Sequence, residues 1–324
     1  MGKVDLSKYK IRTDLIIEDD SAKHLEEDIN GVSVMTTKKD GNYITISFDD
    51  ITDSDNYKKV MDVVTLKIKE ILNINNIKES DLGLIIGLGN RLSTPDSLGV
   101  RVIDNIVVTE HIYKLGKLSD GMGRVCSFIP GVMGNTGIET SDIINAIIKK
   151  IKPNYVILVD ALASRCIDRL NKTIQITDTG IHPGSGIGNN RVEISKKTMN
   201  IPVIAIGVPT VVTSNVIVYD TINYLYKHIA YIKEYEEINK LTFNRFNYKN
   251  KLKDKYLNDM ERKELLGLFG ELDSIKQREL IDEVLNSTEL SLIVTPTEID
   301  FLINKLSKLI ADSINNSLHR QITY

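Results

Sequence analysis

The sequence lacks the features that would direct a protein to a membrane or across one. No apolar run approaches the roughly 20 residues that a membrane-spanning helix needs. Residues 1–7 contain no apolar core of a signal peptide, and Leu6 stands where N-myristoylation requires Ser or Thr. These absences predict a cytoplasmic protein with no membrane partner.

Cysteine and net charge are also scarce. Cys126 and Cys166 are the only cysteines among the 324 residues. One lies in an apolar strand-like run and the other in a predicted helix, which favours two buried reduced thiols over a disulfide or a metal pair. The formal charge of -3 provides neither a basic stripe nor an acidic tail, so no direct contact with nucleic acid is expected.

The central part of the chain, residues 82–206, alternates between strand and helix patterns. Apolar runs predict strands at 82–88, 124–129, 155–159 and 202–207, and alternation predicts an edge strand at 172–177. Helical spacing marks 97–108 and 143–151, where Thr140-Ser141-Asp142 offers an N-cap and a negative first turn. Strands joined by helical crossovers predict an α/β fold with a mostly parallel sheet flanked by helices.

The flanking regions read differently. Residues 14–60 are polar, with an alternating peripheral strand at 43–48, and residues 223–264 favour exposed helices or an insertion. After Pro296, apolar residues at helical spacing predict an amphipathic closing helix; they are Ile299, Leu302, Ile303, Leu306 and Ile310. No internal repeat or low-complexity linker is present.

Two aspartates follow predicted strands. Asp96 lies in the loop that leaves the strand at 82–88, and Asp160 stands at the carboxyl end of the strand at 155–159. In an open parallel sheet, the functional crevice lies beyond these ends. Two carboxylates in one crevice repel each other, so one holds a proton while the other stays ionised. Such a pair suits acid–base activation of water, but each aspartate can instead cap a following helix, and their spacing does not decide between these readings.

The turn Gly87-Leu88-Gly89 starts like a dinucleotide-binding motif. The pattern needs a third glycine at position 92, which is Leu92, and no acidic residue ends a second strand at the required distance. The motif is broken, and no nucleotide cofactor is expected.

Long segments of the chain resemble the germination protease (spore protease) of endospore-forming bacteria. The resemblance covers nearly the whole sequence and is weakest at about 19–80 and 223–290. It rests on GLGNRLSTPDSLG at 87–99, FIPGVMGNTGIETSDII at 128–144, VDALASR at 159–165, ITDTGIHPGSGIGNNR at 176–191, IPVIAIGVPTVV at 201–212 and VTPTEID at 294–300, together with residues 9–15.

The resemblance implies an endopeptidase made as a zymogen in the spore core. Such enzymes assemble as homotetramers, shorten their own N-terminus, and start the degradation of small acid-soluble proteins that coat spore DNA. The family's functional aspartates match Asp96 and Asp160. Residues 1–10 then form a propeptide, with autocleavage expected between Asp5 and Arg12, and 11–324 form a single α/β peptidase domain with a helical insertion at 223–290. No cofactor is implied.

A more distant resemblance concerns the fold and a metal. The strand-end segments are also similar to hydrogenase maturation endopeptidases, whose fold the chain is expected to share. Their matching acidic positions bind a metal together with a histidine. Those positions are again Asp96 and Asp160, and the histidine candidate is His182, which is alternatively an ordinary loop residue. The glycine-rich stretch that follows Thr179, residues 180–188, is interpreted as a wall of the substrate cleft or as a tight loop. A third reading is a binding module without enzymatic activity on the same fold.

Overall fold

A computed structural model of the chain describes residues 14–19, 22–182, 192–234, 248–288, 290 and 292–320. Its contacts divide the chain into two compact units. The larger unit comprises residues 12–164, 168–211 and 295–324, and the smaller unit comprises 1–11, 165–167 and 212–294. Each unit is described by itself below. No helix among the described residues is both long and apolar enough to cross a lipid bilayer.

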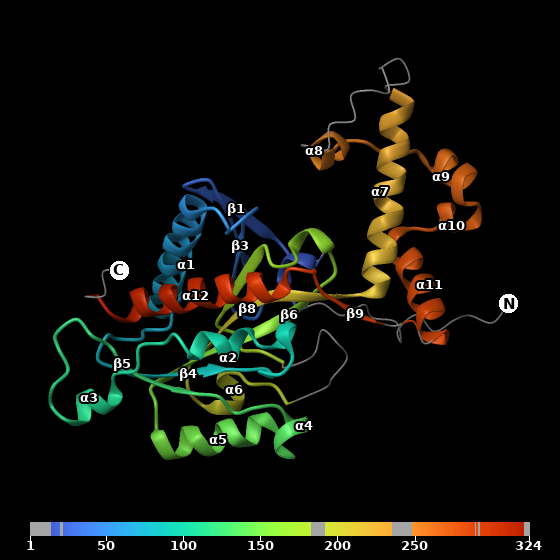
Figure 1. Cartoon of the computed structure of the whole chain (residues 1–324). Coiled ribbons are helices and arrows are strands. Elements are labelled where there is room, and N and C mark those ends of the chain that lie inside the picture. Colours follow the sequence, from blue (N-terminus) through green and yellow to red (C-terminus); the bar gives the residue numbers. More distant parts are fainter. Residues whose placement is uncertain are drawn as a thin grey trace. The chain divides into compact units, whose positions relative to one another are not determined.

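The larger unit is built on a sheet whose strands follow the order β1-β2-β3-β7-β8-β6-β4-β5 (Figure 1). The strands are β1 His24–Ile29, β2 Val32–Lys38, β3 Asn42–Ser47, β4 Leu82–Gly87, β5 Arg124–Phe128, β6 Tyr155–Ser164, β7 Thr173–Thr177 and β8 Val203–Thr213.

The sheet is mixed, so the prediction of a mostly parallel sheet is wrong. Strands β1, β2, β3, β7 and β8 pair antiparallel in that order, whereas β4 pairs parallel with β5 and β6. Strands β6 and β8 run the same way, because the Val156 amide donates to Pro202 at their start and Leu162 lies against Gly207 further along. The antiparallel half follows from the short turns at Asn30-Gly31 and 39–41, which can join only antiparallel strands.

Two predicted strands differ in position or length. The segment predicted as an edge strand is β7, which lies inside the sheet between β3 and β8, with every residue buried. Its alternation of polar and apolar residues arises in part because Gln175 and Thr177 face a polar pocket rather than solvent. Strand β6 continues to Ser164, so Asp160 lies within β6 and not at its end.

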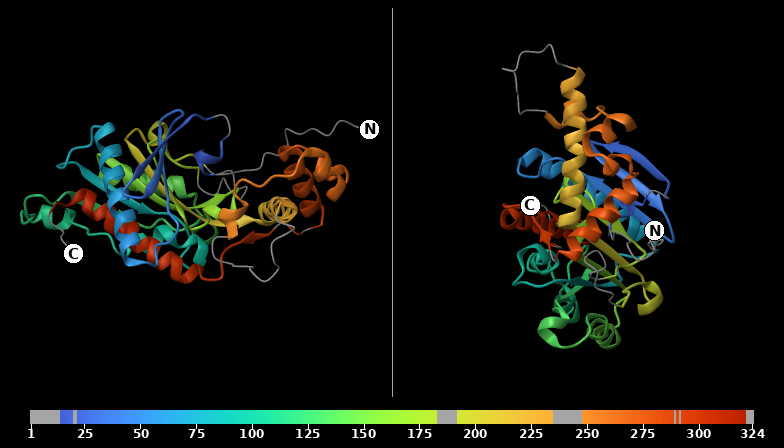
Figure 2. Two further views of the ribbon diagram at one scale, coloured as in Figure 1. Left: turned by 90° about the horizontal axis from the view of Figure 1, so that it is seen from above. Right: turned by 90° about the vertical axis from the view of Figure 1, so that its right-hand side faces the viewer.

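One face of the sheet is covered by three helices: α1 Ser54–Ile74, α2 Leu98–Ile103 and α12 Ile299–Leu318 (Figure 1). Helices α1 and α12 pack against each other, as both views in Figure 2 allow the reader to follow. The face predicted for the closing helix is confirmed, because Ile303, Leu306 and Ile310 are fully buried in the main core. Helix α2 is shorter than the predicted 97–108 and ends at Ile103.

The opposite face is covered in part, by α5 Thr140–Ile151 and α6 Lys196–Met199 (Figure 1). The predicted apolar stripe on α5 is confirmed by Ile144 and Ile148, which pack on Leu84 and Leu158. The N-cap residue of α5 is Glu139. Shorter elements connect these layers; they are η2 Ile16–Glu18, η3 Thr94–Asp96, α3 Glu110–Lys114, α4 Met133–Thr136 and η4 Ile167–Arg169.

The smaller unit is mainly helical in its described part. Its elements are α7 Ser214–Glu234, α8 Tyr248–Leu252, α9 Asp259–Leu266, α10 Leu268–Glu271, α11 Ser274–Ser287 and the short strand β9 Ile293–Val294. Helix α11 packs along α7, where the Arg278 guanidinium stacks 3.6 Å above the Tyr219 ring. Strand β9 pairs antiparallel with the last two residues of β8. These helices fall in the segment predicted as a helical insertion.

Cys126 and Cys166 form no disulfide with each other, and each is half-buried rather than fully buried as expected. Cys126 lies on β5, where burial raises the pKa of its thiol to about 11. At neutral pH this thiol is therefore protonated and a poor nucleophile.

Candidate active site

Asp160 stands where β6 loses its parallel neighbour. The pairing of β4 with β6 ends at Gly87 and Val159, and the Val159 carbonyl then accepts a hydrogen bond of 2.8 Å from the Leu88 amide. Asp160 is the next residue. Because side chains alternate along a strand, its carboxylate belongs to the face of Val156 and Leu158, which α5 covers. Strand β4 has ended at this point, so its pairing with β6 does not extend to Asp160.

The Asp160 side chain is only 6% exposed, and its Oδ1 accepts a hydrogen bond of 2.9 Å from the Ala161 amide. A buried carboxylate needs such donors, since it would otherwise be strongly destabilised. No helix follows Asp160, because Ala161 continues the strand. The alternative that Asp160 caps a helix is therefore wrong.

Asp96 lies in η3, at the end of the loop that leaves β4. The loop closes on itself through the Asn90 amide, which donates to the Asp96 carbonyl at 3.0 Å. Gly89 makes this closure possible: its φ is +109°, and a Cβ there would lie 1.9 Å from the Asp96 carbonyl oxygen and 3.2 Å from Asp96 Oδ1. Only glycine tolerates both the backbone conformation and the close approach. The Asp96 carboxylate consequently lies next to the turn that ends β4.

Side chains from several elements hold the Asp96 loop. Arg91 donates two hydrogen bonds of 2.8 Å to Asp104, and these bonds hold the pKa of Asp104 below its usual range. Ser97 donates to the Thr94 carbonyl at 2.8 Å and accepts from Arg101 Nε at 2.9 Å. The loop is therefore fixed at both of its ends.

The start of α2 lies directly on the backbone of the two strands. A Cβ at Gly99 would approach the Val159 carbonyl oxygen to 2.2 Å and the Leu88 carbonyl oxygen to 2.5 Å. In addition, η3 lies against β6 and α12. Asp96, in η3, and Asp160, in β6, thus both lie near the carboxyl end of β4, on two elements that contact each other.

A pocket of about 610 Å³ opens on the face of the sheet that α5 and α6 leave uncovered. Its floor comes from alternate residues of four adjacent strands; they include Tyr43, Gln175, Thr177, Ala205, Gly207 and Leu162. Leu162 is two residues beyond Asp160 on the same strand, so both side chains face the same side. The nearest pocket residue on β6, Leu162, is therefore roughly 7 Å along the strand from Asp160.

Residues of two further segments complete the lining of this pocket. Gly180, Ile181 and His182 line one side, and Lys196 and Lys197 line another. The described part of the predicted cleft wall, residues 180–182, thus lies on the pocket, whereas 183–188 fall outside the described residues. His182 is exposed. Within the described residues, which include Asp96, Asp160 and His182, no three or more His, Cys, Asp or Glu side chains are arranged to hold a metal ion. The conditional ligand set therefore does not fit a metal here.

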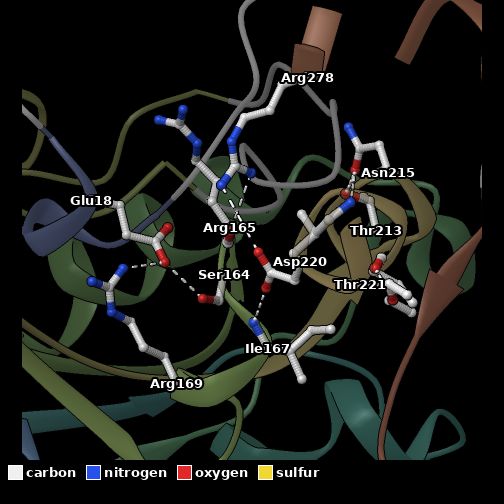
Figure 3. A network of polar contacts seen from close by, with 12 residues as sticks. Glu18, Ser164, Arg165, Ile167, Arg169, Thr213, Asn215, Asp220, Thr221 and Arg278 are labelled. Carbon is white, nitrogen blue, oxygen red and sulfur yellow. Dashed lines mark hydrogen bonds and ion pairs between the residues drawn. The ribbon is translucent and has the colours of Figure 1, made fainter. Parts of the chain in front are cut away.

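The first described residues fasten to the last residues of β6. Asp14 Oδ2 accepts a hydrogen bond of 3.0 Å from the Ala163 amide, and the Gln175 amide group donates to the Asp14 carbonyl at 2.9 Å. Figure 3 shows the next anchor, where Glu18 accepts hydrogen bonds from Ser164 at 2.8 Å and from Arg169 at 2.7 Å. Sequence reasoning missed these contacts, because partners about 150 positions apart leave no local pattern.

The fold, Asp160 on β6 and Asp96 in the loop after β4 define an α/β protein with a candidate carboxylate site near an open pocket. Comparison with known proteins identifies the family. The sequence profile of the family described as germination protease matches residues 10–324. The germination protease of Oceanobacillus iheyensis is 44% identical over 314 residues, covering 94% of this chain and 85% of the relative.

Two Bacillus relatives align over nearly their full length. The germination protease of Bacillus velezensis is 41% identical over 356 residues, covering 99% of this chain and 97% of its own. That of Bacillus subtilis is 39% identical with the same coverage, 99% and 97%. The chain belongs to the germination protease family and is therefore an endopeptidase, which confirms the resemblance and excludes a binding module without activity.

Proposed function

We propose that the enzyme starts the degradation of small acid-soluble spore proteins during germination, with Asp96 and Asp160 as its catalytic residues. The observation that supports the assignment is that Asp160 on β6 and Asp96 in η3 both lie near the carboxyl end of β4, on elements that contact each other. Both also lie in segments that carry the family resemblance. The enzyme acts in the cytoplasm of the spore, where its substrates coat the DNA.

The chemistry follows from the repulsion between two carboxylates that share a site. One of them keeps a proton near neutral pH while the other stays ionised, so the pair titrates as a unit. The ionised member removes a proton from water as the water attacks the peptide carbonyl, and the protonated member gives its proton to the leaving amide nitrogen. The pocket beside Asp160 holds a segment of the substrate, since its floor offers both apolar residues, such as Leu162 and Ala205, and polar ones, such as Gln175 and Thr177.

The test is isosteric replacement of each carboxylate. Asp96→Asn and Asp160→Asn should each lower kcat for a small acid-soluble spore protein by roughly 100-fold or more, because each removes one acid–base group. Asp120→Asn, at an exposed position on the connection to β5, is the matched control and should keep full activity. A folded Asp96 or Asp160 variant with full activity would remove that residue from the mechanism.

The metal-assisted alternative, a maturation peptidase of the hydrogenase-processing type, receives no support from the family match. A shared fold with those peptidases remains a prediction of the sequence. We derive no step through a metal, because the three candidate ligands do not converge. Treatment with a chelator and His182→Ala should both leave cleavage unchanged. A stoichiometric metal whose removal stops cleavage would instead assign His182 a ligand role.

Self-processing and assembly complete the proposal. Residues 1–10 serve as a propeptide that is removed between Asp5 and Arg12, and 11–324 form the peptidase as a homotetramer. The proposed cleavage segment lies outside the described residues. N-terminal sequencing after incubation at mildly acidic pH should show shortening in the native enzyme but not in Asp160→Asn. Light scattering should give four times the chain mass of 36.4 kDa.

A further inference from the structure

The turn that carries Asp96 has three consecutive carbonyl groups, and each of them has its own hydrogen-bond donor. The Thr94 carbonyl accepts from Ser97, and the Asp96 carbonyl accepts from Asn90. Both of these donors belong to the loop itself. The Pro95 carbonyl differs, because its donor is the hydroxyl of Thr210, which is 115 positions away in the sequence, at 2.7 Å.

Thr210 is well placed to hold a turn rigidly. It lies near the carboxyl end of β8 and is 0% exposed. Because side chains alternate along a strand, it is on the same face of β8 as Ile206 and Val208, which belong to the main core. Its own carbonyl accepts a hydrogen bond of 2.9 Å from the Thr295 hydroxyl. Because Thr210 is fully buried and Pro95 is half-buried, the bond is shielded in part from water, and such a bond is stronger than one at the surface.

The bond also links the loop after β4 to a strand that is not its neighbour in the sheet. The loop leaves β4, and η3 lies against β6, while Thr210 belongs to β8 on the other side of β6. Proline has no amide hydrogen, so the carbonyl is the only backbone group through which Pro95 can be fastened. The residue that follows is Asp96, and any drift of the Pro95 peptide plane moves its carboxylate.

We propose that Thr210 is a positioning residue that fixes Asp96 relative to Asp160 by holding the Pro95 carbonyl. The inference rests on the proposed catalytic role of Asp96. Loss of the Thr210 hydroxyl lets η3 shift while leaving the substrate pocket intact, because Thr210 does not line the pocket. The effect therefore falls on kcat and not on KM.

Two pairs of variants isolate the hydroxyl. Thr210→Val keeps the shape of the side chain and removes the donor, and should lower kcat about tenfold or more, as expected for a misplaced catalytic group. Thr210→Ser keeps the donor and should retain at least about half of kcat. If Thr210→Val does not fold, Thr210→Ala compared with Thr210→Ser gives the same contrast within a smaller side chain.

The control is Thr109→Val. Thr109 is also 0% exposed, and its hydroxyl donates to the Gly123 carbonyl at 2.6 Å, just before β5 and thus at the amino-terminal end of the parallel strands, opposite to the end that carries Asp96. This variant should lose stability but keep kcat. The acidic limb of the kcat–pH profile should shift in Thr210→Val and stay in place in Thr109→Val, because only the first changes the coupling of the carboxylates.

Asp96→Asn measured in the same assay distinguishes a failure of the positioning role of Thr210 from a failure of the catalytic role of Asp96. If Asp96→Asn is inactive and a folded Thr210→Val keeps kcat within about twofold, or if Thr210→Ser loses as much as Thr210→Val, the positioning role is wrong. If Asp96→Asn is itself fully active, the catalytic assignment of Asp96 fails, and the role of Thr210 fails with it.

Discussion

The two faces of the sheet in the larger unit are covered to different degrees. One face carries α1, α2 and α12 and forms a continuous apolar core, with side chains such as Ile68, Val102 and Ile310 fully or almost fully buried. The other face carries α5 and α6 over only part of its width and keeps a pocket of about 610 Å³. Asp160 faces this second side.

The difference indicates that the closed face stabilises the fold and that the open face provides space for the substrate. A closed apolar face contributes most of the burial that stabilises the unit, whereas an open face can admit a peptide. The Asp96 loop is held from the closed side through α2 and Thr210. Rigid packing on one face thus positions a group that acts at the sheet edge. Changes on the closed face should alter stability, except at Thr210, which holds the Asp96 loop and should alter kcat, and changes on the open face should alter kinetics.

The largest effect is expected from Gly99→Ala, at the contact between α2 and the sheet. The added Cβ would meet backbone atoms of Val159 and Leu88 at 2.2 to 2.7 Å, and backbone cannot swing away as a side chain can. The free energy of unfolding should fall by roughly 3 kcal/mol, the upper range for overpacking. Gly134→Ala is the control, because its Cβ meets nothing within 4 Å. Chemical denaturation measures both, and equal stabilities would contradict the close packing.

A smaller effect is expected from His319, at the end of α12, on how the free energy of unfolding depends on pH. His319 is 2% exposed, its Nε2 bonds to the Val107 carbonyl at 3.2 Å, and its Nδ1 has no partner among the described residues. Burial lowers the pKa of this imidazole below its usual 6.5. The unfolded chain therefore takes up a proton that the folded state resists.

The sign follows from this difference in proton uptake. The free energy of unfolding should be highest above about pH 6.5 and fall as the pH drops, by at most about 1.4 kcal/mol per pH unit from this group. His319→Phe should make the slope between pH 7 and pH 5 shallower, while His111→Gln, at an exposed position on α3, should not change it. An unchanged slope in His319→Phe would show that other groups dominate the acid sensitivity.

The smallest effect is expected on the open face, from Tyr43→Phe. The Tyr43 hydroxyl accepts a hydrogen bond of 2.9 Å from Thr179, and both residues line the pocket. Loss of one such bond costs about 1 kcal/mol, so KM should rise up to about fivefold while kcat stays the same. Tyr113→Phe, exposed on α3, should leave both constants unchanged. A fall in kcat with constant KM would place Tyr43 in the chemical step instead of the pocket wall.

The sequence predicts the elements whose signal is local. The apolar run of β4, the stripe of Ile144 and Ile148 on α5, and the closing helix α12 each show a pattern within about ten residues, and the structure confirms them. Helix α1 and the β1–β2 hairpin were missed. Strand β1 is mostly exposed and reads as a charged loop, although Asn30-Gly31 is a strong hairpin signal.

The order of the strands and the supports of the site have no local signal. Nothing near β7 in the sequence indicates that it lies between β3 and β8, so its alternation was interpreted as that of a sheet edge. The aspartates themselves could be found, because an acidic residue after an apolar run is conspicuous. The bond from Thr210 to Pro95 could not, because it joins elements that only the completed sheet brings together.

The anchors of Asp14 and Glu18 on the end of β6 have a thermodynamic consequence. Every hydrogen bond described between this segment and the sheet involves residues from position 14 onward. Hydrolysis of a peptide bond on the amino-terminal side of Asp14 leaves all of these bonds intact. The hydrogen bonds that hold residues 14–18 on the sheet are therefore the same before and after such a cut. Because the peptide that is cut off diffuses away, such a cleavage is irreversible.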